Sequence, residues 1–239
     1  MRGPVGKRVP LRIRRPLGRG AYRIAAGMRR VERHSRSGIL DRLGGLPFLR
    51  IRDLVYDDSF YDRVDPGSAE LYARIAAALV DLWAPRSVVD VGCGTGLVLE
   101  KLAARGVEVR GVEGSRAAIA RSPVADRIVR ANLERGVPQL GTVDLCLCIE
   151  VAEHLRPRSA ERLVEGLTRL GRVVVFTAAQ PGQPGTAHLN CRPRSYWRSL
   201  FAHHGFEASP QEAALAAAIS GVAEPQYIHS NLMVFERAG

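Results

Sequence analysis

The spacing of apolar residues predicts an alternation of strands and helices over most of the chain. From Asp65 and Pro66, a pair typical of a helix start, apolar residues recur at the spacing of one helix face. This stripe consists of Leu71, Ile75, Leu79, Leu82 and Trp83. Short runs rich in β-branched residues then alternate with helical stretches. The pattern indicates parallel βαβ units with helices on both faces of a sheet.

The predicted elements follow one another in regular order. Strands are predicted at residues 87–92, 107–114, 126–133, 143–150, 172–178, 206–209 and 231–237. Helices are predicted between them at residues 97–106, 115–122, 160–170, 193–205 and 211–220. We therefore expect a Rossmann-like, doubly wound α/β fold with a seven-stranded sheet. The sheet is expected to be mostly parallel, with the antiparallel C-terminal strand at its edge.

Charge divides the chain into two parts. Residues 1–53 hold 15 Lys and Arg against three acids, a net charge of +12, whereas residues 54–239 hold 20 against 21. We expect a basic, partly flexible arm over 1–53 and one domain over 54–239. Such an arm attracts nucleic acid, anionic membranes or acidic partners over long range. The alternative is a nucleotide bias toward arginine codons, because Lys7 and Lys101 are the only lysines.

Composition narrows the partners and the location. Aromatic residues that stack on bases are sparse in the arm, which gives little support to base recognition. No apolar stretch approaches the roughly 18–20 residues of a membrane span, and the N-terminus lacks the apolar region of a signal peptide. The four cysteines lack the spacing of a zinc site and the density of a disulfide scaffold. We expect a soluble, cytoplasmic protein with reduced thiols.

A glycine-rich turn follows the first predicted strand. In VVDVGCGTG, residues 88–96, the glycines Gly92, Gly94 and Gly96 let the backbone turn sharply and let a ligand approach the main chain. Asp90 precedes them, and the GxGxG spacing differs from the GxGxxG that opens onto a pyrophosphate. Taken alone, the turn is compatible with NAD, with FAD or with no ligand.

The ends of the next strands add groups that suit a nucleoside. Glu113, at the tip of the second strand, is placed to accept hydrogen bonds from both hydroxyls of a ribose. Asn132 and Leu133 follow the third strand, where an amide and an apolar contact can frame an adenine ring.

With the run VDLCLCIEVAEHL, these motifs resemble the class I S-adenosylmethionine-dependent methyltransferases over about residues 56–237. The resemblance implies that S-adenosyl-L-methionine is the cofactor, although that family more often has Asp at the position of Asn132. The residues it assigns to the cofactor are Asp90, Gly92, Gly94, Gly96, Glu113, Asn132, Leu133 and Ile149.

The run IEVAEHL, residues 149–155, places ionisable groups at the exit of the fourth strand, where doubly wound folds bind ligands. The pattern Glu150-x-x-Glu153-His154 resembles the ExxEH motif of ubiquinone-pathway O-methyltransferases and of methyltransferases that modify the terminal ribose of small RNAs. That resemblance implies a downstream histidine, here His188, which completes a divalent metal site of Mg²⁺ or Mn²⁺.

Two other interpretations of these residues stay open. Glu150, His154 and His188 are catalytic candidates without a metal, because a neutral histidine can take a proton from an acceptor hydroxyl. The third interpretation is a strand that has ended and a solvated helix that begins.

Aromatic residues and the remaining histidines are assigned from their positions. Tyr196 and Trp197 are expected to wall the acceptor pocket. The resemblance implies that Tyr56, Phe60 and Tyr61 fold over the cofactor and substrate; the alternative is a hydrophobic anchor for the arm. His203 and His204 near a helix end, and His229 at the start of the last strand, are expected to be structural.

The resemblance implies an enzyme that methylates an oxygen of a small hydroxylated metabolite, such as a natural product, a sugar or a quinone-like molecule. One alternative is an RNA ribose methyltransferase that uses the basic arm for phosphate contacts. The other is a non-catalytic module that keeps the fold and uses the basic arm as an interaction tether.

Overall fold

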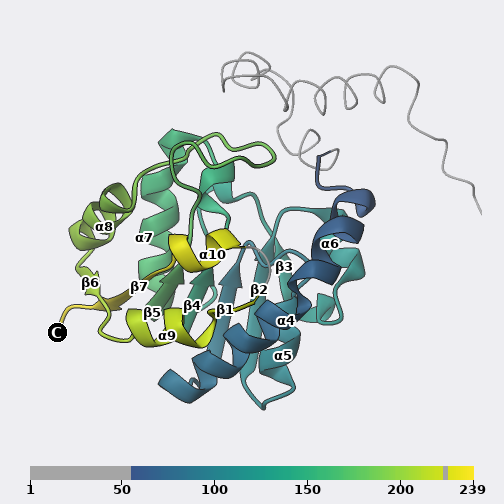
Figure 1. Ribbon diagram of the computed structural model, residues 1–239, viewed down its shortest axis with the longest axis horizontal. Helices are drawn as coiled ribbons and strands as arrows, with labels where there is room; N and C mark the ends of the chain where they lie inside the picture. Colours follow the sequence, from purple (N-terminus) through teal and green to yellow (C-terminus); the bar gives the residue numbers. More distant parts are fainter. Residues whose placement is uncertain (1–54, 223–225) are drawn as a thin grey trace, which may run out of the picture. The chain divides into compact units, whose positions relative to one another are not determined.

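The computed structural model of the protein describes residues 55–222 and 226–239, so the predicted basic arm over 1–53 lies outside the described residues. Seven strands form one sheet in the order β3-β2-β1-β4-β5-β7-β6 (Figure 1). The strands are β1 (Ser87–Val91), β2 (Glu108–Glu113), β3 (Ile128–Arg130), β4 (Val143–Cys148), β5 (Gly171–Phe176), β6 (Phe206–Ala208) and β7 (Met233–Arg237). The helices are α4 (Asp58–Trp83), α5 (Leu97–Ala103), α6 (Arg116–Arg121), α7 (Ala160–Leu170), α8 (Arg194–His203), α9 (Glu212–Ala218) and α10 (Gln226–Asn231).

The strand pairing confirms the Rossmann-like fold. Strands β1 to β5 pair in parallel, and β7 runs antiparallel to both β5 and β6. The prediction that the last strand lies at the edge was wrong, because β6 occupies the edge and β7 lies inside it. Met233, Val234 and Phe235 of β7 are buried, and such a strand needs neighbours on both sides, whereas short β6 is largely exposed.

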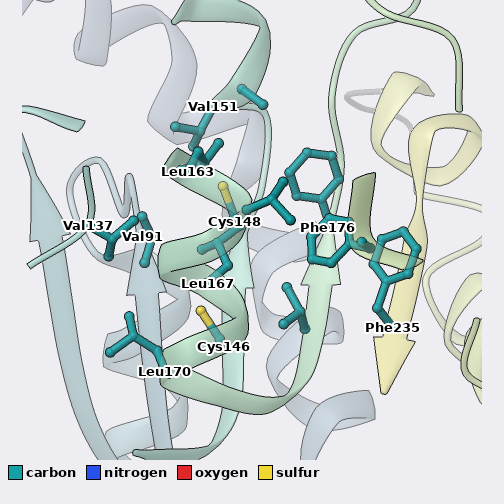
Figure 2. Packing of buried hydrophobic residues seen from close by; sticks show 14 of the residues in the cluster. Val91, Val137, Cys146, Cys148, Val151, Leu163, Leu167, Leu170, Phe176 and Phe235 are labelled. Carbon is teal, nitrogen blue, oxygen red and sulfur yellow. The ribbon is translucent and has the colours of Figure 1, made fainter. Parts of the chain in front are cut away.

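Helices cover both faces of the sheet. On one face, apolar residues of α4, α5 and α9 pack on β1, β4 and β5. On the other face, Leu163, Leu167 and Leu170 of α7 pack over Cys146 and Cys148 of β4 (Figure 2). The two cysteines are completely buried and, like the other two, are free thiols.

Helix α4 begins earlier than the sequence pattern predicts. The start expected at Asp65 and Pro66 was wrong, because the helix begins at Asp58. The side chain of Asp57 caps it by accepting a hydrogen bond from the Phe60 N–H at 3.1 Å. This extension brings the aromatic residues of the first turns to the ligand end of the sheet.

The topology places a crevice at the carboxyl ends of the central strands. The strand order reverses between β1 and β4, and doubly wound sheets bind ligands at such a switch point. Among the residues described, no helix is both long and apolar enough to span a bilayer.

Candidate active site

A cavity of about 240 Å³ lies at the carboxyl ends of β1, β2 and β4. Its lining includes most of the residues that the sequence assigned to a cofactor. These are Asp90, Gly92, Gly94, Glu113, Leu133 and Ile149. Gly96 and Asn132 do not line it: Gly96 caps helix α5, and the Asn132 side chain accepts a hydrogen bond from the Glu134 N–H at 3.1 Å.

The glycine loop adopts conformations that other residues rarely reach. Gly92, Gly94 and Gly96 have φ values of 84°, 55° and 76°, in the left-handed region. A Cβ atom on Gly92 would also overlap the side chain of Val151. Gly92 is therefore required both by the turn and by the close approach of the segment after β4.

Glu113 ties the glycine loop to the start of α6. One carboxylate oxygen accepts the Gly94 N–H at 2.9 Å. The other accepts the N–H groups of Gly114 and Ser115, each at 2.6 Å. These charge-assisted bonds fix the carboxylate at the cavity wall in one orientation.

Asp90 is a carboxyl group held inside the protein. Its side chain is 5% exposed, and burial, together with the neighbouring charge of Glu113, raises its pKa to about 7. Desolvation is the main cause that disfavours the ionised form of Asp90. A positively charged ligand in the cavity would therefore stabilise the ionised carboxylate.

Asp90 is expected to make the unliganded protein less stable as pH rises. Its folded pKa lies above its unfolded value, so its contribution to stability is present below pH ~4 and is lost as pH rises through about 7. Between pH 4 and 8, the free energy of unfolding should therefore fall by about 2–4 kcal/mol less in Asp90→Asn than in the native protein. Urea unfolding of both proteins across this range measures it; parallel pH profiles would contradict the assignment.

An aromatic segment closes one side of the cavity. Tyr56, Phe60 and Tyr61 all line it, and the Ser115 hydroxyl donates to the Tyr56 carbonyl at 3.0 Å. The Tyr56 ring meets the Phe60 ring edge-on at 5.0 Å and the His154 ring at 5.8 Å between centroids. The sequence left two interpretations of this segment open, a cover over the cofactor and substrate or an anchor for the arm. The structure places the segment against the cavity.

Glu150 leaves the fourth strand in an unusual conformation. Its φ is 54°, in the left-handed region, and its N–H donates to the Thr177 hydroxyl at 2.8 Å. Its side chain lines the cavity and accepts a hydrogen bond from Asn231 Nδ2 at 3.2 Å. Such strain in a non-glycine residue persists where the surrounding structure over-determines it, often at functional sites.

Glu153, His154 and His188 gather in one cluster. One possible ligand atom from each lies within 4.8 Å of the others. Glu150 lies outside this group of three, but its carboxylate adjoins that of Glu153 and also accepts the hydrogen bond of Asn231. The metal set of four residues stays a prediction. His154 is the member of the cluster that borders the cavity.

The cluster contains an unsatisfied buried carboxyl group. Glu153 is completely buried, and its Oε1 accepts the Ala179 N–H at 3.2 Å. Its Oε2 has no hydrogen-bond partner within the part of the chain that the structure describes. Burial and the nearby Glu150 carboxylate raise the pKa of Glu153 well above its usual range. A cation beside this oxygen would satisfy it and reverse both effects.

The two imidazoles present nitrogen atoms suited to a ligand role. Burial lowers the pKa of His188, so its ring is neutral near pH 7. His154 Nδ1 lies 3.4 Å from the Ala187 carbonyl, and the two ring centroids are 5.1 Å apart. A Cβ atom on Gly185 would overlap the His188 ring, so the glycine makes room for this histidine.

Helix α8 does not wall the cavity. The prediction for Trp197 and Tyr196 was wrong: Trp197 is completely buried against Phe176 and Phe201, and Tyr196 packs on the same core. The aromatic face of α8 is used to cover the sheet next to α7. His229 lies in α10 rather than in the last strand, and His204 bonds to Glu161 at 3.1 Å.

Several cavity residues were missed from the sequence, among them three with polar side chains. Tyr72 and Asp65 reach the cavity from α4, and Thr95 reaches it from the glycine loop. Burial is the main cause that raises the pKa of Tyr72 to about 12, and the Asp65 carboxyl bonds to the Thr95 side chain. The helical spacing marked α4 as a core helix and gave no signal that its polar residues also face a ligand.

Comparison with known proteins identifies the domain. A family model described as a methyltransferase domain matches residues 89–174. The ubiquinone biosynthesis O-methyltransferase of Acinetobacter baylyi strain ADP1 is 32% identical over 134 residues, which cover 52% of this chain and 51% of that protein. The chain carries a class I S-adenosylmethionine-dependent methyltransferase domain. It spans about half the length of the curated relatives it matches.

Solved structures share the fold of this methyltransferase domain. A magnesium protoporphyrin IX methyltransferase from Synechocystis PCC 6803, with bound S-adenosylhomocysteine, gives a TM-score of 0.56 at 18% identity and covers 83% of this chain and 97% of its own. A sugar N-methyltransferase from Streptoalloteichus sp. ATCC 53650 gives 0.55 at 20% identity, with 76% and 92% covered. At these identities the likeness concerns the fold alone.

Proposed function

We propose that the protein uses S-adenosylmethionine to methylate a hydroxyl oxygen of a small molecule. The observation that carries this proposal is one cavity at the switch point whose wall combines the Glu113 carboxylate with Glu150 and His154. The first suits a ribose, and the other two suit an acceptor hydroxyl. The named relative in ubiquinone biosynthesis is an O-methyltransferase, which agrees with an oxygen acceptor.

The charge of the cavity supports this cofactor. Asp65, Asp90, Glu113 and Glu150 line it, and no Lys or Arg is found among its described lining residues. S-adenosylmethionine carries a sulfonium and an ammonium against one carboxylate, so an acidic cavity attracts it. In this proposal Glu113 holds the ribose hydroxyls, Leu133 contacts the adenine, and Ile149 lies beside the methionine end.

The residues at the exit of β4 divide into two roles. Glu153, His154 and His188 fit a divalent cation, because they offer one unsatisfied carboxyl oxygen and two imidazoles in reach of one another. A Mg²⁺ or Mn²⁺ ion bound there would lower the pKa of an acceptor hydroxyl next to it. Glu150, outside the cluster and at the cavity wall, is placed to take the hydroxyl proton.

Methyl transfer then proceeds as a displacement at the methyl carbon. The acceptor oxygen forms a bond to that carbon as the carbon–sulfur bond breaks, which leaves S-adenosylhomocysteine and a methyl ether. The proton of the acceptor passes to a Glu150 carboxylate oxygen. Tyr56 and Phe60 close the cavity and exclude water from the sulfonium.

A panel of acceptors tests the proposed reaction. The protein is incubated with S-adenosylmethionine labelled in the methyl group and with dihydroxybenzoates, hydroxylated sugars, an amino sugar and an oligoribonucleotide. We expect a methyl ether of a hydroxylated small molecule, identified by mass spectrometry. Labelling of the amino nitrogen alone, or of the oligoribonucleotide alone, would contradict it. The RNA alternative depends on the basic arm, which lies outside the described residues, and stays a prediction.

Removal of metal ions is expected to stop turnover. Excess EDTA should reduce methyl transfer by at least about tenfold, and Mg²⁺ or Mn²⁺ should restore it, because a bound cation stabilises developing charge by several kcal/mol. Calorimetric titration with Mn²⁺ should show one site in the native protein and none in His188→Ala. Full activity in EDTA, with no Mn²⁺ binding, would contradict the cation and leave Glu150 and His154 as the candidate bases.

A further inference from the structure

A buried amide links helix α10 to the candidate active site. Asn231 is the last residue of α10 and is completely buried. Its Nδ2 donates to Glu150 Oε1 at 3.2 Å and to Gln183 Oε1 at 3.0 Å. Its Oδ1 accepts from Gln180 Nε2 at 3.1 Å and from Gln183 Nε2 at 3.0 Å. Every hydrogen-bonding position of this amide is therefore used.

Packing alone does not call for an amide at this position. Ile228 and Leu232, on either side of Asn231 in the chain, are each 2% exposed and join the apolar cluster that α4 covers. They attach α10 to the domain without polar contacts. A buried amide is stable only when its hydrogen bonds are made. The presence of Asn231 here therefore indicates that its hydrogen-bond partners must be held in one orientation.

We propose that Asn231 is a positioning residue that holds the Glu150 carboxylate toward the acceptor, an inference that rests on the proposed function. The Glu150 backbone is fixed by its left-handed φ and by its bond to Thr177, but its side chain stands next to the carboxyl group of Glu153. Nδ2 of Asn231 offers hydrogen to one carboxylate oxygen and so selects one orientation among the rotamers.

The same amide also reaches the loop that carries His188. Gln183 forms a two-bond pair with Asn231, and its side-chain oxygen accepts the Gln180 N–H at 2.7 Å. The Gln183 carbonyl faces His188 Nδ1 at 3.4 Å. A continuous set of contacts thus runs from Glu150 through Asn231 and Gln183 to His188. It connects the proposed proton acceptor to the cluster of Glu153, His154 and His188.

Asn231→Asp is the sharpest test, because it changes little in volume but replaces the donor that faces Glu150 with an oxygen. Hydrogen exchange measured by mass spectrometry requires no acceptor. We expect exchange at least about tenfold faster in residues 149–155 and 180–190, and no change in β1 and β2. Ser230→Ala, an exposed change in the same helix, is the matched control and should match the native protein.

A double-mutant cycle separates positioning from stability. With the most active acceptor of the panel, Asn231→Asp should lower kcat by about 10–100-fold while the Kd for S-adenosylmethionine stays within about twofold. In a Glu150→Gln background, the same change should cost less than about twofold, since it acts through Glu150. If Asn231→Asp does not fold, Asn231→Ser is measured in the same way.

Two results would overturn the proposal: exchange that rises uniformly over the domain or not at all, or losses of kcat that multiply in the double variant. The exchange experiment also separates this inference from the proposed function. If the native protein methylates no acceptor but exchange rises locally as expected, the function fails and the positioning of Glu150 by Asn231 stands.

Discussion

Replacing His188 by alanine is expected to reduce methyl transfer by about 100-fold or more while leaving the affinity for S-adenosylmethionine nearly unchanged. His188 belongs to the cluster with Glu153 and His154 and does not line the cavity that holds the glycine loop and Glu113. Its loss removes an imidazole from the proposed cation site and leaves the lining of that cavity unchanged. Steady-state kinetics and calorimetry on the same preparation measure both quantities.

His203→Ala is the matched control for this change. His203 lies at the end of α8 and is exposed, so its replacement should leave kcat at the native value. The double variant of His154 and His188 should lose little more than either single variant, since ligands of one site act as a unit. Native turnover in both single variants would return the cluster to the interpretation of a strand that has simply ended.

Gly92→Ala is expected to weaken cofactor binding at least about tenfold and to destabilise the domain by about 1–3 kcal/mol. Two costs combine at this position: φ is 84°, and the added Cβ would overlap the side chain of Val151. Relief of that overlap requires a shift of the glycine loop, which carries the Gly94 N–H that Glu113 accepts. Calorimetry and thermal unfolding measure the two effects.

The chain supplies a control with the same backbone strain and no overlap. Gly106 has φ 81°, and a Cβ there would meet nothing within 4 Å. Gly106→Ala should cost about 1 kcal/mol of stability and leave cofactor affinity unchanged. Equal losses of affinity in the two variants would show that the close approach of Val151 to Gly92 does not shape the cavity.

The sequence predicted the sheet, and most of the residues it assigned to a cofactor line one cavity, because the signals for both are local. Short β-branched runs mark buried parallel strands, and the glycines and Glu113 stand at fixed offsets from the ends of β1 and β2. The position of β7 within the sheet could not be predicted from its own local sequence. It depends on which strand is apolar enough to need two neighbours, a comparison with β6 that periodicity does not make.

The arrangement of the ionisable residues after β4 could be predicted only in part, because the direction of their side chains depends on residues far along the chain. The spacing brought Glu150, Glu153 and His154 together in sequence, yet the left-handed φ of Glu150 turns its carboxylate toward Asn231, far along the chain. The room that Gly185 makes for the His188 ring is likewise a contact that composition does not reveal. Trp197 was misplaced because an aromatic residue on an amphipathic helix fits a core as well as a pocket.

The most direct test of the central claim is a calorimetric titration of the native protein and of Glu113→Ala with S-adenosylmethionine. Three backbone N–H bonds orient the Glu113 carboxylate at the cavity wall. In the proposed function this carboxylate accepts hydrogen bonds from the ribose hydroxyls. We expect one binding site in the native protein and a binding free energy weaker by about 1–3 kcal/mol in the variant. Binding of NAD in place of S-adenosylmethionine, or equal affinity in the two proteins, would contradict it.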